Sequence, residues 1–379
     1  MTTYVDLHIL QNLPPSCVNR DDSGSPKTAV YGGVRRLRVS SQSWKRATRQ
    51  FFESRLAPQE LGIRTKRVVE LVASRIAAQS PELAGKAEEL AKAVFAAAKI
   101  KVEPPKNKKE ATAESGYLLF LSPSQVDRLA RLAVAAEEQE EKIDAKMAKA
   151  IFKEDHAVDM ALFGRMVADD ADLNVDAACQ VAHAISTHPV ETEHDFFTAV
   201  DDVKAELKSE DEAKDAGAGM MGTVEFASAT IYRYATVNLD MLKENLGSTE
   251  AALRALETFI DSFTLAMPTG KQNTFANRTL PHLVSVSVRT DQPVSLVGAF
   301  EEPVKPDATS GYLGRSVERL ASHAAAIENA YGLRPAASFV AGLADQGETA
   351  ALGDPVGFAE LAGKVRAAVS PLLGEQESA

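Results

Sequence analysis

The chain has 379 residues and a formal net charge of −11, and its 45% hydrophobic and 25% charged residues are typical of a globular protein with a large core. No apolar run reaches the length of a membrane span and no signal peptide is visible, so we expect a cytoplasmic, bacterial protein with no membrane partner. Cys17 and Cys179 form no metal or redox spacing, so we expect reduced thiols and no cofactor.

A strand opens the chain and a loop follows it. Apolar and polar residues alternate over residues 3–11, which is the period of a strand. Residues 12–27 contain three prolines and a glycine, which predicts an irregular loop.

Positive charge is concentrated between Arg20 and Arg49. This segment holds eight basic and two acidic side chains, a net +6, so the rest of the chain carries −17. Scattered surface charge would not segregate in this way. A concentrated positive surface on an acidic protein indicates a site for a polyanion, and phosphate is the obvious one.

The same segment predicts a strand followed by a helix. Leu37 and Val39 alternate with polar neighbours, which indicates a strand with one buried face. Ser40 or Ser41 is a suitable N-cap, and a helix N-terminus can bind phosphate. The predicted helix carries four polar side chains on one face: Gln42, Lys45, Arg46 and Arg49. An ordinary solvated strand and helix remain the alternative to a nucleic-acid or polyphosphate site.

A helical block follows, and β structure returns after it. Helical periods rich in alanine, leucine, glutamate and lysine dominate residues 58–166, where we expect most lysines to be solvated. Residues 174–188 predict a strand, residues 189–222 an acidic excursion, and residues 223–239 a second strand. Two long strands joined by a protruding segment predict an arm. Helices predicted at about 240–246, 249–265, 311–330 and 355–373 and strands at 283–289 and 337–341 follow, and this order predicts an α+β fold.

Signatures of catalysis are mostly missing. Gly270–Lys271 lacks the first glycine and the Ser or Thr of a P-loop, although Lys271 is still a candidate phosphate ligand. There is no GxSxG, HExxH or GxGxxG motif.

Possible metal ligands are densest between His183 and Asp195. His183 and His188 would face opposite sides of a strand, so we expect separate structural histidines rather than a metal site. The pairs Asp21–Asp22 and Asp201–Asp202 could hold magnesium for phosphodiester cleavage, but adjacent acids are common in turns.

Phe196 and Phe197 are aromatic residues inside the otherwise polar excursion. Either they pack the base of the arm, or one of them wedges beside an unstacked base of a single-stranded nucleic acid. The sequence leaves both interpretations open.

The chain resembles a known family, the CasC-type backbone subunits of the type I-E CRISPR complex Cascade. The resemblance rests on four stretches: residues 14–49 (PPSCVNRDDSGSPKTAVYGGVRRLRVSSQSWKRATR), the GRM of Gly164–Met166, residues 182–202 (AHAISTHPVETEHDFFTAVDD) and residues 222–242 (GTVEFASATIYRYATVNLDML). It runs over nearly the whole chain and is most specific in residues 1–50 and 180–245.

The resemblance implies a right-hand shape and a role in antiviral defence. The palm would be an RRM-like (ferredoxin-like) sheet, the fingers a helical insertion and the thumb a β-hairpin arm. Copies would stack head to tail as a helical filament along the guide CRISPR RNA (crRNA), and each thumb would bend the RNA so that bases flip out. The segments between would pair with target DNA. The subunit would have no nuclease activity and would bind other Cascade subunits.

The resemblance also implies domain boundaries. The palm would comprise residues 1–58, 171–190 and 223–379, the fingers 59–170 and the thumb 191–222. Val203–Gly219 is long and acidic for a thumb near RNA, which favours an outward-facing tip.

At matching positions the resemblance implies a set of RNA contacts. The RNA backbone would be held by Arg20, Lys27, Ser40, Gln42, Lys45, Arg46 and Arg49, with Met166 against a base near the kink and Phe197 in the thumb. We add as RNA-binding candidates Arg36, Arg38 and Lys271. Candidates for contact with DNA in the fingers are Lys106, Lys108, Lys109, Lys142, Lys146 and Lys149.

Two other functions stay open. Related backbone subunits of other CRISPR types cleave RNA with a thumb-region aspartate, which would be Asp201 or Asp202 in a metal-dependent endoribonuclease. A scaffold that binds only proteins is the third possibility.

Overall fold

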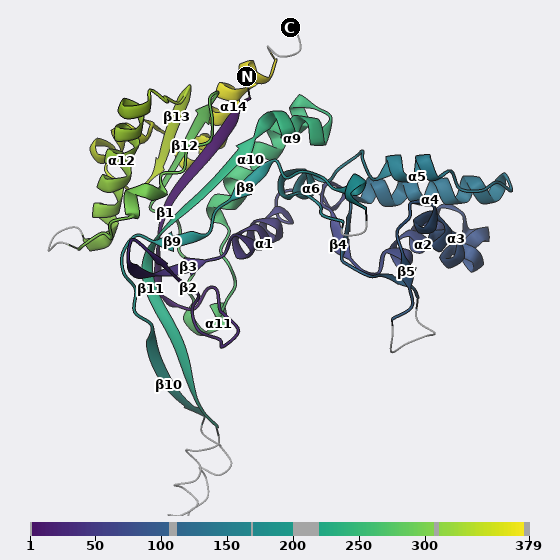
Figure 1. Ribbon diagram of the computed structural model, residues 1–379, viewed down its shortest axis with the longest axis horizontal. Helices are drawn as coiled ribbons and strands as arrows, with labels where there is room; N and C mark the ends of the chain where they lie inside the picture. The colour runs from purple at the N-terminus through teal and green to yellow at the C-terminus, as the bar shows by residue number, and fades with distance from the viewer. Residues whose placement is uncertain (1, 106–111, 168–169, 200–219, 307–310, 375–379) are drawn as a thin grey trace, which may run out of the picture.

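The computed structural model describes residues 2–105, 112–167, 170–199, 220–306 and 311–374 (Figure 1). A large sheet with helices on both faces, a separate helical block and a projecting arm make up the molecule, so the predicted α+β class is confirmed. Within these ranges no helix combines the length and the apolar character that a bilayer crossing requires.

One sheet organises the fold. Its hydrogen-bonded order is β14-β13-β12-β1-β11-β9-β3-β2, with β8 and β10 also pairing with β11, and only the β13–β14 pair is parallel. The strands are β1 (Tyr4–Ser16), β2 (Thr28–Tyr31), β3 (Val34–Val39), β8 (Cys179–Val181), β9 (Ala184–Ser186), β10 (Glu193–Ala199), β11 (Met220–Asn238), β12 (Leu283–Arg289), β13 (Ala337–Gly342) and β14 (Asp354–Pro355).

Helices cover both faces of this sheet. One face packs against α1 (Ser41–Phe52), α9 (Leu239–Leu246), α10 (Thr249–Leu265) and α14 (Phe358–Gly374), and the other against α12 (Gly311–Tyr331) and η4 (Val297–Phe300). The short helices α11 (Gln272–Phe275), α13 (Gln346–Thr349) and η5 (Ala350–Leu352) lie in loops. Because both faces are covered, even the polar side chains of Asp6 and His8 on β1 are buried.

The helical block has an apolar core of its own, formed by residues such as Val72, Phe95 and Leu129. It contains α2 (Val68–Gln79), α3 (Ala87–Ala97), α4 (Pro123–Glu138), α5 (Ala145–Ile151), α6 (Val158–Phe163), η1 (Pro58–Glu60), η2 (Pro81–Lys86), η3 (Ala171–Leu173) and the two-stranded ribbons β4 (Ile63–Thr65) with β7 (Leu119–Leu121) and β5 (Val102–Glu103) with β6 (Glu114–Ser115). A capping box begins α4, in which Ser122 and Gln125 exchange hydrogen bonds between side chain and backbone. The apolar residues that follow in α4 are buried in the core of the block.

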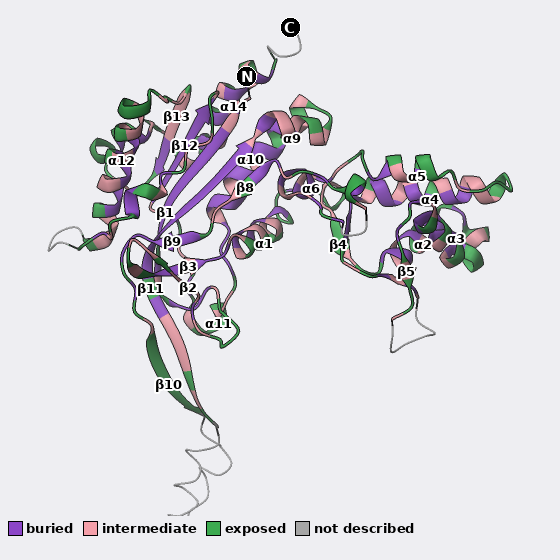
Figure 2. Ribbon diagram, viewed as in Figure 1, coloured by how far each residue is buried: buried purple, intermediate pink, exposed green. Residues whose placement is uncertain are grey.

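The arm is a hairpin of β10 and the first part of β11, and it projects away from the sheet (Figure 2). β11 is 19 residues long, and it becomes buried only from Ala227 onward, where it enters the sheet. The arm therefore offers two solvated faces, while its base continues directly into the core.

Three predicted boundaries are wrong. β1 continues to Ser16, because a register shift between Leu13 and Ser16 accommodates Pro14 and Pro15 in the strand. Residues 174–188 form two short strands instead of one, since β8 and β9 pair with different stretches of β11. β10 falls inside the predicted excursion, where pairing with β11 outweighs an acidic sequence of low strand propensity.

Candidate nucleic-acid interface

An open groove of about 580 Å³ lies between the loop before β2, helix α1 and the loop after α10. Its lining includes three predicted RNA-binding residues, Arg20, Arg46 and Lys271. The two loops are in direct contact, because a Cβ on Gly270 would lie only 2.3 Å from the carbonyl oxygen of Val18. The fold thus brings together cations that are far apart in the sequence.

Asp21 and Asp22 line the same groove. The carboxylate of Asp21 accepts hydrogen bonds from the N–H groups of Ser23 and Ser25, both at 3.0 Å. The hydroxyl of Ser23 also donates to it, which lowers the pKa of Asp21. Asp21 therefore shapes the loop from within, and the groove contains three cations and two carboxylates.

The N-cap of helix α1 is Ser40, one of the two serines predicted for this position. The Oγ of Ser40 accepts the N–H of Ser43 at 3.3 Å, and the N–H of Ser40 donates to Asn19 Oδ1 at 2.8 Å. These bonds hold the helix start against the loop that carries Arg20. Ser40 itself is buried, whereas Gln42 is exposed in the first turn, so the polar groups free to meet a ligand there are those of Gln42 and its neighbours.

The prediction that Arg36 holds RNA is wrong, because its side chain is fully buried. Its guanidinium donates to the carbonyl oxygens of Tyr31, Ser186, Phe300 and Glu301. These acceptors come from β2, β9 and the segment around η4, so Arg36 joins elements of the interior. The alternation that predicted an exposed face fails at Arg36 because a second layer covers that face of β3.

Arg38 lies at a more open position on β3. Its Nη1 is 3.0 Å from Nδ1 of His183, and its Nε donates to the carbonyl oxygen of Thr28. Burial, with the nearby positive charges of Arg38 and Lys27, lowers the pKa of His183. His183 is therefore neutral at physiological pH, and Lys27 and Arg38 form a second small group of cations beside the sheet.

The far end of α1 is tied to the helical block. The Nε of Arg49 is 2.9 Å from the buried carboxylate of Asp159, and its guanidinium lies 4.7 Å from the ring centre of Phe120. The Nζ of Lys45 is 5.7 Å from the ring centre of Phe163. Arg49 thus has a structural partner, while Lys45 lies over the last residue of α6, three residues before Met166.

Met166 is the most exposed of the large apolar side chains that the structure describes, at 83%. The preceding Arg165 is buried and donates to the carbonyl oxygens of Leu173, Phe120 and Phe152. Burial lowers the pKa of Arg165 to about 10, so it still carries its charge at neutral pH. The arginine anchors the chain and Met166 projects into solvent, which suits a side chain that meets a ligand.

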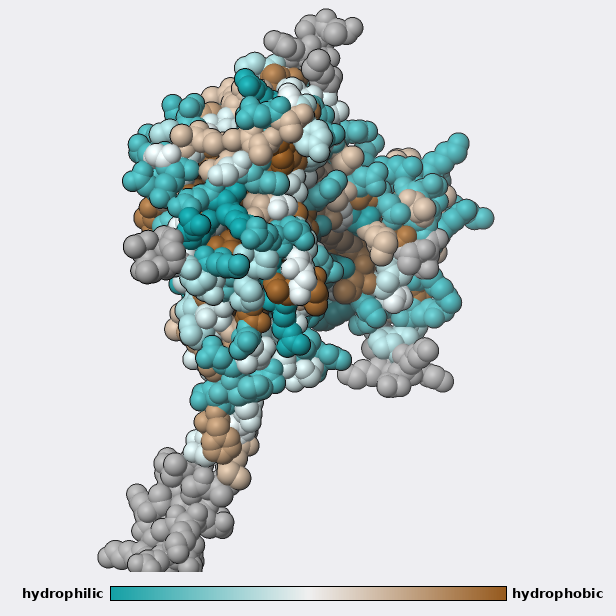
Figure 3. Space-filling model, turned by 60° about the vertical axis from the view of Figure 1, so that its left-hand side comes forward, coloured by the Kyte–Doolittle hydropathy of each residue, from teal (hydrophilic) through white to brown (hydrophobic). Residues whose placement is uncertain are grey.

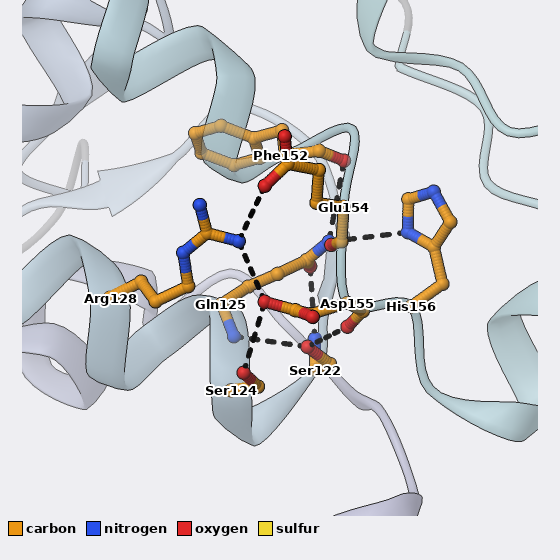
Figure 4. A network of polar contacts seen from close by, with 8 residues as sticks. All are labelled: Ser122, Ser124, Gln125, Arg128, Phe152, Glu154, Asp155 and His156. Atoms are coloured by element: carbon orange, nitrogen blue, oxygen red, sulfur yellow. Dashed lines mark hydrogen bonds and ion pairs between the residues drawn. The ribbon is translucent and has the colours of Figure 1, made fainter. Parts of the chain in front are cut away.

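A polar network holds the segment to which Arg165 is anchored (Figure 4). The amide of Gln125 donates to the carbonyl oxygens of Phe152 and Glu154 from the start of α4. Arg128 pairs with Glu154 and Asp155 at 2.8 and 2.6 Å. Helix α4 therefore fixes the carbonyl oxygen of Phe152, which also accepts a hydrogen bond from Arg165.

The aromatic residues of the arm lie on opposite faces of the hairpin. Phe197 is opposite Gly222, and its ring covers that glycine so closely that a Cβ there would lie 2.5 Å from it. Phe196, opposite Thr223, is 65% exposed, and Met221 is also exposed. Hydrophobic residues, drawn in brown, are visible at the end of the arm that lies away from the sheet (Figure 3). Phe197 thus packs across the hairpin toward its far end and not at the base of the arm, and Phe196 is the freer of the two rings.

Comparison with known proteins identifies the family. The model of the family described as CT1975-like protein matches residues 5–362. The chain belongs to the CT1975-like family. A chain of a solved structure described as "CRISPR RNA-guided surveillance complex, pre-nicking" is similar, with a TM-score of 0.83 and 36% identity over 96% of this chain and 99% of that chain. A chain of a second "CRISPR RNA-guided surveillance complex" has a TM-score of 0.71 and 29% identity over the same shares. No curated protein matches.

The predicted DNA-contacting lysines of this CT1975-like chain fall into three groups. Lys106, Lys108 and Lys109 lie outside the described residues. Lys149 pairs with Asp170 at 2.6 Å, which raises the pKa of Lys149. Lys142 and Lys146 are exposed. Within the described ranges, Lys142 and Lys146 are thus the better placed candidates.

In the part of the CT1975-like chain that the structure describes, no three His, Cys, Asp or Glu side chains lie where they could share a metal ion. His188 is buried and stacks on Tyr312 at 3.7 Å, and its Nε2 accepts the N–H of Thr230. Asp201 and Asp202 lie outside the described residues.

Sequence reasoning missed Arg233, which is buried beneath α1. Its guanidinium lies 3.8 Å from the ring centre of Trp44 and donates to Gln11 Oε1 at 2.7 Å and to the carbonyl oxygens of Phe263 and Thr264. Burial lowers the pKa of Arg233 to about 9. It ties β11 to α1 and to the end of α10, which leads into the groove loop. An arginine among alternating strand residues gives no signal of such burial.

Proposed function

We propose that this chain is a crRNA-binding backbone subunit of a CRISPR surveillance complex of the Cascade type I-E. The observation that carries the proposal is the convergence of Arg20, Arg46 and Lys271 on one open groove of a chain with net charge −11. The likeness to chains of CRISPR RNA-guided surveillance complexes supports it.

The groove chemistry suits sugar-phosphate rather than base edges. Arginine and lysine bind phosphate oxygens whatever the sequence, and the exposed amide of Gln50 in the groove, with that of Gln42 next to the lining residue Ser43, adds neutral donors. A subunit that accepts any guide must avoid reading the bases. Met166 and the exposed face of the arm then act on base planes, where an apolar side chain can wedge beside an unstacked base.

The architecture supports the same proposal. The order β12-β1-β11-β9, with α1 and α10 on one face, supports the proposal that the palm is RRM-like. The fingers are the helical block, residues 59–170, and the thumb is the arm, residues 191–222. Residues 1–58, 171–190 and 223–379 complete the palm. The acidic Val203–Gly219 lies outside the described residues, and we assign it to an outward-facing thumb tip.

Further copies of the chain are the expected partners. Head-to-tail contacts are heterologous, so they extend into an open helical filament along the crRNA. The ordered guide segments would pair with target DNA, and other Cascade subunits would cap the filament. In this proposal the chain is non-catalytic and works in the bacterial cytoplasm.

The full chain, purified from cells that express crRNA, provides the first test. A single discrete RNA length on a denaturing gel would support a guide-bound subunit, whereas a smear or the absence of RNA would contradict it. In a salt titration of RNA binding, Arg46→Ala with Lys271→Ala should flatten the log–log slope by roughly 1.4, the contribution of two single-strand phosphate contacts. Arg254→Ala is the matched control, because that arginine pairs with Glu60 at 2.9 Å.

A further inference from the structure

A basic connection joins helix α1 to the helical block. Residues 61–67 hold Arg64, Lys66 and Arg67 and no acidic residue, and all three basic side chains are exposed. Arg67 pairs with Glu70 at 2.5 Å. Arg64 and Lys66 make no ion pair with any other residue that the structure describes, so their charges are free to meet a ligand.

The strand register places Arg64 on the face of the β4–β7 ribbon that lies toward α1. In the β4–β7 ribbon Arg64 is directly opposite Phe120, and residues opposite each other in an antiparallel pair project from the same face. The ring of Phe120 lies over Gly62, where a Cβ would be 2.3 Å from it. Gly62 stands two residues before Arg64, so the spacing of a strand puts both on that face.

Phe120 connects this face to the polar side of α1. Its ring lies 4.7 Å from the guanidinium of Arg49, which follows Arg46 by three residues on the same side of the helix. The charge of Arg49 is balanced by Asp159. Arg46 and Arg64, for which no ion pair is found among the described residues, therefore lie at the two ends of one track with Arg49 between them.

We propose that Arg64, with Lys66 beside it, binds phosphate of the guide strand and extends the interface from the sheet onto the helical block. A strand that leaves the groove along the polar side of α1 passes the partly exposed Arg49, which lies over the buried ring of Phe120, and then meets Arg64. β4 lies where the chain passes from α1 to the helical block (Figure 1). The proposal rests on the proposed function, since it assumes that the groove holds RNA.

The experiment compares full-length variants in a salt titration of fluorescently labelled single-stranded RNA. Arg64→Ala should weaken binding about threefold to tenfold and flatten the log–log salt slope by about 0.7, as expected for one lost phosphate contact. Arg64→Lys should keep most of the slope, because a positive charge remains. Arg75→Ala is the matched control, an exposed arginine of the same block that pairs with Asp127 at 3.0 Å.

Each outcome has a distinct meaning. If Arg64→Ala behaves like Arg75→Ala while Arg46→Ala still weakens binding, Arg64 is not a contact and the groove proposal stands. If wild type shows no salt-dependent RNA binding, the groove proposal fails first. Capture of complementary DNA by preformed protein–RNA complexes tests whether Arg64 contacts the guide RNA or the target DNA. If Arg64→Ala lowers only the capture of DNA, the assignment of Arg64 to the guide is overturned. Unchanged circular dichroism of the variants excludes misfolding.

Discussion

Replacing Arg49 by alanine should weaken folding more than RNA binding. Its guanidinium pairs at 2.9 Å with Asp159, whose other carboxylate oxygen accepts the N–H of Gly62. Breaking a fully buried ion pair costs about 3–5 kcal/mol, and because the side chain of Arg49 is 27% exposed and partly screened we expect about half of this, roughly 2 kcal/mol.

The loss should depend on pH. Burial raises the pKa of Asp159 even with Arg49 present, and removal of Arg49 raises it further. A carboxyl with a raised folded-state pKa favours the fold while protonated and costs stability once it ionises, so the defect should be full at neutral pH and shrink as pH falls. Urea unfolding followed by circular dichroism at neutral and mildly acidic pH measures both effects.

The double variant Arg49→Ala/Asp159→Asn is the control, because it removes the buried charge together with its partner. It should recover most of the lost unfolding free energy at neutral pH. The reasoning would be refuted if Arg49→Ala unfolded like wild type and instead flattened the salt dependence of RNA binding.

Other outcomes are also expected. Because burial raises the pKa of Asp6 from 3.8 to about 6, stability should fall as pH rises between these values, and Asp6→Asn should flatten that part of the urea-unfolding profile. Met166→Ala should change the unfolding free energy by less than about 0.5 kcal/mol, yet lower the fluorescence of an aminopurine base flipped from bound RNA. Gly164→Ala should destabilise by about 1–2 kcal/mol in the same unfolding assay, because Gly164 has a φ of 79° and a Cβ would lie 2.8 Å from a carbonyl oxygen. Incubation with complementary RNA and magnesium should give no regularly spaced cuts on a gel, and cuts that disappear in Asp201→Ala or Asp202→Ala would instead identify a nuclease.

Local pattern predicted much of the fold. The strand β3 and helix α1 with its N-cap Ser40 follow from alternation and capping, which are properties of neighbouring residues. Pairing with distant strands is not a local property. It extended β1 through Pro14 and Pro15 and made a strand of the acidic residues in β10.

The sequence predicted which types of residue line the candidate site, but not how deeply each of them is buried. Arg20, Arg46 and Lys271 do line one groove. Arg36 and Arg38 look alike in the sequence, yet only Arg36 is fully enclosed, because the segment near η4 lies over it. Whether an arginine meets water depends on the layer above its strand, and that layer comes from far along the chain.

The buried guanidinium of Arg233 has a consequence for any anion outside. Its hydrogen-bond acceptors are neutral oxygens of Gln11, Phe263 and Thr264, so none of them cancels the positive charge as a carboxylate would. It lies behind Trp44, whose helix forms one wall of the groove, where mobile counterions do not reach it. Part of the attraction felt by a passing strand thus originates inside the protein, and it should persist at salt concentrations that mask the surface lysines.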